Sequence, residues 1–291
     1  MSKISVLGST SLVGRYFIDQ KTDFQLNCFS RKSTSCTFLD LQDENTFLNF
    51  SYENSFIVSF APISLFKDLL INIEEQNLSK LKTLKGAIIY SSTSAITKKF
   101  AANESDKNLS KELIYSEKII LSIFKKYSIN CLIIRPTIIF GVYKDINDKN
   151  FSKIKRLFRK LPFCLIPSNT GYRQPIHFSE LSNLTYFFLE KFNNIKEQEK
   201  FNKIIEVGGD EELTYSDLLF RLSINASTFT NKRCKIIPIP NNIFYLLIYP
   251  LLIIKPKLFE AILRMQSDLS GFPKYSDYLG KTLNKIPIEN F

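Results

Sequence analysis

The chain has 291 residues, 44% of them hydrophobic and 23% charged, which is an ordinary globular composition. This length allows one large domain or two unequal ones. The formal net charge is +11, but the lysines are spread along the whole chain without a helix-turn-helix, zinc-finger or aromatic RNA-binding motif. We therefore expect no nucleic-acid partner, and a positive field also suits a small anionic substrate.

Five cysteines are scattered along the chain without C-x-x-C spacing, so the sequence predicts neither a disulfide framework nor a bound metal. Residues 1–13 contain no apolar segment of signal-peptide length. Nothing later in the chain reaches the roughly 18 uninterrupted apolar residues of a membrane span. We expect a cytoplasmic protein.

The most apolar segment covers residues 243–254. It is too short to span a bilayer, is broken by Pro250 and is followed by Lys255 and Lys257. We expect a buried helix here, and peripheral membrane contact through an interfacial segment is the alternative.

The first fourteen residues organise the chain. The apolar strand pattern of residues 3–7 ends at Gly8 and continues, through Gly14, into an apolar helical pattern. This is how a first strand joins a helix in a dinucleotide-binding fold, where one glycine permits a tight turn, another permits close helix packing, and the helix N–H groups hold a pyrophosphate. Ser11 stands where the middle glycine is usual, and an ordinary strand–turn–helix is the alternative. The predicted cofactor residues of this turn are Gly8, Ser9, Thr10, Ser11, Leu12, Val13 and Gly14.

Residues 24–29 are predicted to form the second strand, after a helix over 12–20. Ser30, Arg31 and Lys32 follow it directly. At this point of such a fold an acidic residue binds the ribose 2′-hydroxyl of NAD, and a basic residue pairs with the 2′-phosphate of NADP. Because no acidic residue is present, we expect NADP, with NAD as the alternative; these charges also fit an ordinary exposed loop.

Further strands are predicted over 36–39, 55–60, 86–90, 130–134 and 203–207, with helices over 108–127, 151–160 and 179–191. Strands that alternate with helical segments of this length predict right-handed crossovers and a parallel sheet. The fold class is therefore α/β, a Rossmann-type doubly wound parallel sheet with a smaller C-terminal substrate domain. Residues that end these strands complete the predicted cofactor site: Asp40, Leu41, Phe60, Ala61, Pro62, Arg135 and Pro136.

Composition changes after the sixth strand, where residues 143–150 are polar. We place the domain boundary near Val142, so that residues 1–142 form the dinucleotide-binding domain and 143–291 a smaller substrate-binding region. Segments around 173–208 are expected to return to the first domain. Residues 173–178 are predicted as one short strand, Ser179 as the N-cap of the helix after it, and Thr214 as the start of another helix.

Five motifs in this order resemble the extended, atypical short-chain dehydrogenases/reductases of the NAD-dependent epimerase/dehydratase family. The similarity covers almost the whole chain and rests on motifs at residues 8–14, 89–94, 133–141, 173–181 and 206–214. The resemblance implies an NAD(P)-dependent oxidoreductase or epimerase that acts on a nucleotide-linked sugar in polysaccharide biosynthesis, most concretely a 4-keto-sugar reductase. The resemblance is also compatible with a homodimeric protein. The alternative is an NAD(P)-binding protein of the same fold with a degenerate active site and a structural or regulatory role.

The chemistry of this family uses a serine or threonine hydroxyl, a tyrosine that acts as acid or base, and a lysine that holds the nicotinamide ribose. The resemblance puts Thr93 at the hydroxyl position, with Ser92 and Ser94 able to substitute. The family pattern is Tyr-x-x-x-Lys, whereas Tyr115 and Lys118 are three residues apart. We predict Thr93, Tyr115 and Lys118 as the catalytic residues.

Two alignments of this helix remain open. A three-residue spacing falls about 60° short of a full helical turn, so Tyr115 and Lys118 can share one helix face. In the other alignment Glu117 matches a downstream acid of the family, and Leu109 and Leu113 take the tyrosine and lysine positions. The usual proton-transfer groups are then absent.

Substrate residues follow from the same resemblance. Arg173 matches an arginine that clamps the nucleotide-sugar diphosphate, Asn150 an asparagine at a helix start that reaches the same diphosphate, and Arg264 a second phosphate contact. His177, the single histidine, falls in a motif that packs a strand–helix corner, so we expect a structural role for it.

Overall fold

The computed structural model describes residues 2–32, 35–52, 55–76, 81–194, 201–228 and 233–280. The chain divides into two compact units. Unit 1 comprises Met1–Lys99, Lys107–Pro136 and Phe178–Val207, and unit 2 comprises Phe100–Asp106, Thr137–His177 and Gly208–Phe291. The chain thus leaves unit 1 at Pro136, earlier than the boundary predicted near Val142.

Unit 1 is built on a seven-stranded parallel sheet in the order β13-β6-β5-β4-β1-β2-β3. The strands are β1 (Lys3–Leu7), β2 (Gln25–Ser30), β3 (Thr37–Phe38), β4 (Ser55–Ser59), β5 (Gly86–Tyr90), β6 (Asn130–Pro136) and β13 (Asn202–Val207). The central strands β4 and β5 are buried throughout, as the strands of a sheet covered on both faces must be. The predicted Rossmann-type fold is confirmed, and its strand order reverses between β1 and β4.

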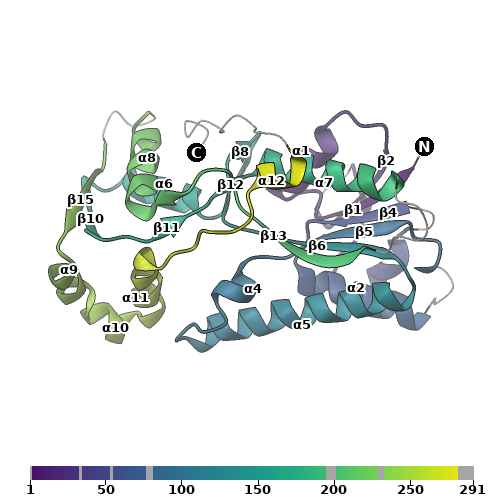
Figure 1. Cartoon of the computed structure of the whole chain (residues 1–291), viewed down its shortest axis with the longest axis horizontal. Coiled ribbons are helices and arrows are strands. Elements are labelled where there is room, and N and C mark those ends of the chain that lie inside the picture. The colour runs from purple at the N-terminus through teal and green to yellow at the C-terminus, as the bar shows by residue number, and fades with distance from the viewer. Residues whose placement is uncertain are drawn as a thin grey trace. The chain divides into compact units, whose positions relative to one another are not determined.

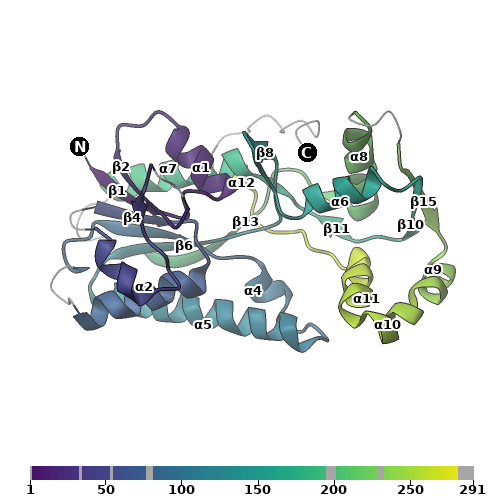
Figure 2. The same cartoon turned by 180° about the vertical axis from the view of Figure 1, so that it is seen from behind.

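Helices cover both faces of this sheet (Figures 1 and 2). On one face lie α2 (Ile63–Gln76) and α5 (Glu104–Lys126), and on the other lie α1 (Leu12–Asp19) and α7 (Phe178–Asn194). The described residues of the unit also form two shorter helices, the 3-10 helix η1 (Glu44–Asn49) and α4 (Ser94–Thr97). Because α7 begins at Phe178, its N-cap position is His177. The prediction that Ser179 is the N-cap is therefore wrong by two residues, and Ser179 lies inside the first turn.

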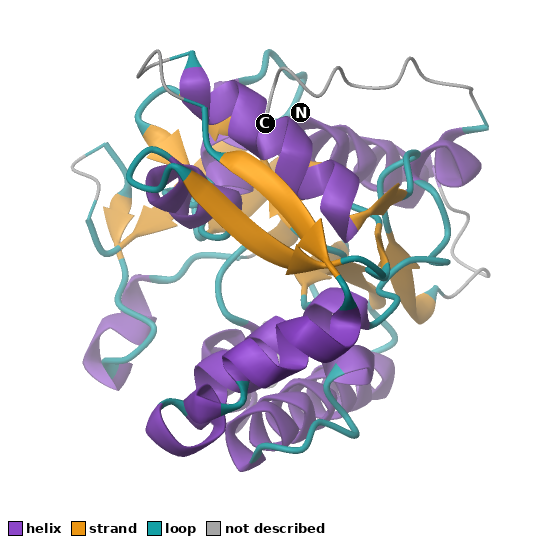
Figure 3. Cartoon of the chain, turned by 90° about the vertical axis from the view of Figure 1, so that its left-hand side faces the viewer, coloured by secondary structure: helices purple, strands orange, loops and turns teal. Residues whose placement is uncertain are grey.

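Unit 2 contains short strand pairs and helices around its own core. The parallel strands β10 (Phe163–Pro167) and β15 (Lys235–Ile239) pair with each other (Figure 3). The helices α6 (Phe151–Phe158) and α8 (Tyr215–Ser227) supply much of the apolar core. The other strands are β7 (Ile139–Phe140), β8 (Val142–Tyr143), β9 (Ile146–Asn147), β11 (Tyr172–Arg173), β12 (Ile176–His177) and β14 (Leu213–Thr214). Residues 173–178, predicted as one strand, thus form parts of two strands that pair with different partners.

The segment after β15 forms α9 (Asn241–Ile248), α10 (Pro250–Ile254) and α11 (Pro256–Leu263), and the chain continues through η2 (Arg264–Gln266) to α12 (Tyr275–Leu279). The prediction of a buried helix over 243–254 is wrong. Only Phe244 and Ile248 of α9 are buried, and α10 buries none of its side chains. Pro250 is the first residue of α10, and the segment forms two short helices. None of the helices within the described ranges combines the length and the apolar character needed to cross a membrane.

Candidate functional site

The turn between β1 and α1 requires glycine at both of its ends. Gly8 has a φ of +71°, and a Cβ on it would lie 2.6 Å from the backbone nitrogen of Ala61. A Cβ on Gly14 would lie 2.4 Å from the carbonyl oxygen of Gly8. The turn therefore lies at the carboxyl ends of β1 and β4, at the reversal of strand order where open parallel sheets bind their ligands.

Ser11, which replaces the usual middle glycine, is the N-cap of α1. Its backbone is extended, and its Oγ accepts a hydrogen bond of 3.1 Å from the backbone N–H of Gly14. The hydroxyl is thus turned toward the helix that it caps. The N–H groups of Leu12 and Val13 belong to the first helical turn and have no acceptor within the helix, so with the positive end of the helix they suit a pyrophosphate. Ser11 is compatible with a dinucleotide site.

Ser9 and Thr10 differ in their surroundings. Ser9 is buried, and its Oγ donates a hydrogen bond of 3.1 Å to the carbonyl oxygen of Phe29, which ties the turn to β2. Thr10 is exposed beside it. The side chain of Ser9 therefore holds the turn in place, while Thr10 is accessible to a ligand.

The segments after β2 and β3 meet through side chains. The exposed Arg31 guanidinium lies 3.8 Å from the carboxylate of Asp40 and donates a hydrogen bond of 3.0 Å to Gln42. The hydroxyl of Ser30 accepts a hydrogen bond of 3.0 Å from the N–H of Lys32, which shapes the loop. The structure thus brings together Arg31 and Asp40, two predicted cofactor residues. An exposed ion pair of this length is weak, so a ligand phosphate can compete for Arg31.

Apolar surface is supplied by the segments after β3 and β4. Leu41 packs against the core of unit 1. The ring of Phe60 lies 4.9 Å from that of Tyr90, centroid to centroid, and the buried Ala61 approaches the turn at Gly8. Pro62 is exposed just before α2. These predicted residues therefore follow the strand ends on the same edge of the sheet as the glycine turn.

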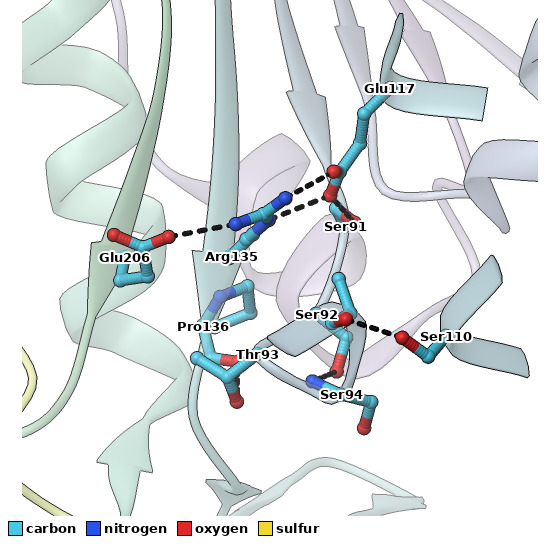
Figure 4. A network of polar contacts seen from close by, with 10 residues as sticks. Ser91, Ser92, Thr93, Ser94, Ser110, Glu117, Arg135, Pro136 and Glu206 are labelled. Atoms are coloured by element: carbon cyan, nitrogen blue, oxygen red, sulfur yellow. Dashed lines mark hydrogen bonds and ion pairs between the residues drawn. The ribbon is translucent and has the colours of Figure 1, made fainter. Parts of the chain in front are cut away.

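The hydroxyl groups after β5 are engaged within unit 1 (Figure 4). Thr93 is buried, and its Oγ1 donates a hydrogen bond of 3.1 Å to the carbonyl oxygen of Pro136. The Oγ of Ser92 accepts a hydrogen bond of 3.1 Å from the N–H of Ser94. Thr93, predicted to hold a substrate oxygen, thus links the end of β5 to the end of β6.

Glu117 on α5 is the centre of a buried polar network (Figure 4). It accepts a hydrogen bond of 2.5 Å from the Ser91 hydroxyl and bonds of 2.8 Å and 2.5 Å from Nε and Nη2 of Arg135. Nη1 of Arg135 donates a further bond of 2.9 Å to Glu206 on β13. Hydrogen bonding to Glu117, outweighing the effect of burial, raises the pKa of Arg135. The guanidinium of this predicted cofactor residue therefore joins α5, β6 and β13.

Tyr115 and Lys118 lie on the exposed side of α5. Tyr115 is 56% exposed, and its ring centroid lies 5.4 Å from Nζ of Lys67 on α2. Lys118 is also exposed. Within the described residues no hydrogen bond joins either side chain to Thr93. The buried polar residues of α5 are Ser110, Ser116 and Glu117. This burial pattern fits the alignment in which Glu117 takes the place of the family acid.

In unit 2 the predicted diphosphate clamp, Arg173, is buried among acceptors of its own chain. Its Nη1 donates to the carbonyl oxygens of Tyr172 at 2.7 Å and Ser267 at 2.5 Å, and its Nη2 donates to that of Arg264. The guanidinium carbon lies 4.7 Å from the ring centroid of Tyr215. Burial lowers the pKa of Arg173 from its ordinary value. Arg173 therefore fixes the segment that follows α11.

The same segment carries Arg264, whose Nη2 forms an ion pair with Asp106. Asn103 donates a second hydrogen bond, of 2.8 Å, to the same carboxylate oxygen. The two predicted phosphate contacts, Arg173 and Arg264, are thus brought together, and each is bonded to groups of the chain itself.

Asn150 is exposed immediately before α6 and makes no side-chain capping bond. The buried Asp148 does this instead. Its Oδ1 accepts hydrogen bonds from the N–H groups of Asn150 at 3.0 Å, Phe151 at 2.6 Å and Ser152 at 3.3 Å. The positive end of α6, predicted to face a diphosphate, already carries a carboxylate.

Asp148, Asp106 and Glu206 are polar residues that sequence reasoning missed. Asp148 lies three residues before Phe151 and outside the N-cap position at Asn150, so the usual helix-start signal does not single it out. Asp106 and Glu206 had no local signal either, because their arginine partners lie 158 and 71 residues away in the sequence.

No protein-family model and no curated protein sequence matches the chain. Solved structures do match. The UDP-glucose 4-epimerase of Thermotoga maritima, solved with UDP-glucose, is 12% identical over 82% of this chain and 86% of that chain, with a TM-score of 0.59. RMD from Pseudomonas aeruginosa, complexed with NADPH, is 12% identical over 82% and 87%, with a TM-score of 0.58. MoeE5, in complex with UDP-glucose and NAD, is 11% identical over 99% and 96%, with a TM-score of 0.61.

At these sequence identities the likeness concerns the fold. The parallel strand order, the glycine turn at its reversal and the matched solved structures agree with one another. They confirm the resemblance at the level of the fold, and the chain has the Rossmann-type α/β fold that these solved structures share.

Proposed function

We propose that the chain binds a nicotinamide dinucleotide at the carboxyl edge of the unit 1 sheet, with NADP preferred over NAD. The turn from Gly8 to Gly14 carries this proposal, because close backbone approach requires both glycines and the first turn of α1 offers amides to a pyrophosphate. Arg31 and Lys32, with no acidic residue beside them, support NADP. Solved structures of similar fold are described as complexes with NADPH or NAD.

The proposed reaction is hydride transfer between C4 of the nicotinamide and a carbon of a nucleotide-linked sugar. Its most concrete form is the reduction of a 4-keto sugar, in which a hydride from NADPH and a proton from an acid convert the carbonyl to a hydroxyl group. Epimerisation, with the cofactor retained through both half-reactions, is the second form. Similar solved structures described as complexes with UDP-glucose support this substrate class.

A second candidate function is dinucleotide binding without turnover, in a structural or regulatory role. The exposure of Tyr115, whose ring lies against Lys67 of α2, favours this second function. The engagement of the Thr93 hydroxyl with Pro136 points the same way.

Two measurements on the purified chain separate these functions. NADPH fluorescence titration reports binding, and loss of NADPH absorbance with a panel of nucleotide 4-keto-sugars, together with analysis for C4 epimers, reports turnover. Binding with turnover supports the enzyme, and binding without turnover supports the second candidate. If neither NADPH nor NADH binds, both are overturned.

Thr10 offers a test of the binding site that leaves the packing of the turn intact. Because Thr10 is exposed beside the proposed pyrophosphate position, Thr10→Glu adds a negative charge there, whereas Thr10→Gln adds similar bulk without charge. We expect Thr10→Glu to weaken NADPH binding by about tenfold or more relative to Thr10→Gln, with unchanged circular dichroism. Equal NADPH affinities of the two variants would show that this turn is not part of the binding site.

Tyr115→Phe tests the predicted proton donor. Loss of a general acid lowers turnover by about 10²–10⁴-fold. Because Tyr115 is exposed and contacts Lys67, we expect a change of less than about tenfold in any turnover detected. A loss of the larger size, with NADPH affinity retained, would assign the proton transfer to Tyr115 and exclude the second candidate.

A further inference from the structure

Two consecutive short helices of unit 2, α9 and α10, and the residue between them expose a group of large apolar side chains. Ile253, Leu246 and Ile254 are 82%, 75% and 70% exposed. We define the apolar patch by six residues that are each more than half exposed: Ile243, Leu246, Leu247, Tyr249, Ile253 and Ile254.

The patch is not needed for the core of unit 2. Phe244 and Ile248, one turn apart, form the buried face of α9, which packs on β10. α10 contributes no buried side chain. Single exposed apolar residues, such as Leu48 in unit 1, are common on protein surfaces. Six within residues 243–254 are not common, and exposed apolar groups of this size mark contact with an apolar surface.

The charges around the patch indicate which surface this is. Residues 241–263, which form α9, α10 and α11, contain two lysines and one acidic residue, Glu260, which accepts a hydrogen bond from Asn103. The exposed Lys255 separates α10 from α11. The chain as a whole carries a net charge of +11. Two copies docked through this patch would bring like charges together, whereas the headgroups of anionic lipids would neutralise them.

The residue types and helix lengths agree with a lipid surface. Leucine and isoleucine insert among acyl chains, and tyrosine favours the interface between headgroups and hydrocarbon. α9 has eight residues and α10 has five, so neither reaches the roughly 20 residues of a membrane span. Short apolar helices with basic neighbours lie in the plane of the interface.

We propose that the apolar patch docks the protein onto the surface of a bilayer that contains anionic lipid. The patch side chains enter the boundary between headgroups and acyl chains, and Lys255 remains at the phosphate level. This docking is independent of the dinucleotide site, so it can be tested without any substrate.

A tryptophan reporter gives a direct test, because the chain contains no tryptophan. The full chain with Tyr249→Trp is mixed with vesicles of phosphatidylcholine alone or of phosphatidylcholine and phosphatidylglycerol. We expect a blue shift of the emission and quenching by brominated lipid with the anionic vesicles. The matched control, Leu48→Trp, places the reporter at an exposed apolar site outside the patch and should show neither change.

Cosedimentation of the otherwise unaltered chain with the same vesicles gives the second readout. We expect the double variant Leu246→Gln/Ile253→Gln to bind about tenfold or more weakly than the unaltered chain. Leu48→Gln should bind as the unaltered chain does, and added salt should weaken binding. Absence of sedimentation with anionic vesicles would overturn the proposal. So would a reporter shift that depends on protein concentration without lipid, because it would assign the patch to a second copy of the chain.

Discussion

Ser11 caps α1 with a hydrogen bond that its Oγ accepts from Gly14. Ser11→Ala removes this bond without altering the backbone requirements at Gly8 and Gly14. We expect the free energy of unfolding to fall by about 1 kcal/mol, as for other helix caps, measured by urea denaturation.

Ser11→Gly is the matched variant, since it restores the glycine usual at this position and costs only a few tenths of a kcal/mol as a cap. We expect it to retain NADPH binding. A Ser11→Ala protein as stable as the unaltered chain would show that the cap contributes nothing.

Arg31 is a single side chain proposed to distinguish NADP from NAD. Replacing it in Arg31→Gln removes the cation proposed to pair with the 2′-phosphate. We expect the affinity for NADP to fall about 10- to 150-fold while that for NAD stays the same, because a charge-assisted hydrogen bond contributes about 1.5–3 kcal/mol. Calorimetric titration of both dinucleotides measures the ratio.

Asp40→Asn is the control for this prediction. It removes the carboxylate 3.8 Å from Arg31 but keeps an oxygen that can accept the backbone N–H of Gln42. NADP affinity should be unchanged or higher. A preference for NADP that survives Arg31→Gln would assign the discrimination to another group.

At the scale of elements, Glu117 and Arg135 hold helix α5 to the sheet. Glu117 is 1% exposed and accepts two hydrogen bonds from the guanidinium. Removal of one partner from a buried ion pair leaves the other charge uncompensated, so we expect Glu117→Gln to lower the free energy of unfolding by about 3 kcal/mol.

Glu206→Gln is the matched comparison, because Glu206 binds the same arginine but its side chain is more exposed. It should lower the free energy of unfolding by no more than about 1 kcal/mol. Urea midpoints measure both variants. Equal losses would mean that burial of Glu117 does not determine the strength of the network.

For the whole molecule, the single histidine predicts how stability changes with pH. Burial lowers the pKa of His177 to about 4, below the ordinary 6.5. The folded protein therefore keeps this imidazole neutral where the unfolded chain takes up a proton. Above pH 6.5 the imidazole is neutral in both states. As the pH falls from 6.5 toward 4, proton uptake by the unfolded chain lowers the free energy of unfolding by about 3 kcal/mol.

His177→Gln should flatten the dependence of unfolding free energy on pH between about 5 and 6.5, a range in which most carboxylates have already titrated. Denaturation by urea across this range measures the slope. An unchanged slope would contradict a buried neutral histidine.

The sequence by itself determined the sheet and the glycine turn at its carboxyl edge, because buried parallel strands are continuous apolar runs and glycine turns depend on local backbone geometry. The range predicted for β5 matches the structure residue for residue, and that for α1 is one residue too long at its end. The roles of Tyr115, Lys118, Arg173 and Arg264 could not be obtained in this way, and they stay predictions.

Only the tertiary structure decided which side chains meet and which remain exposed. Asp106 and Arg264 are far apart in the sequence, so no local pattern records their pairing. The apolar segment after β15 is equally ambiguous, since its composition fits a core helix and a surface helix alike. Its exposure follows from how little of it packs on β10, which depends on the folded arrangement of unit 2.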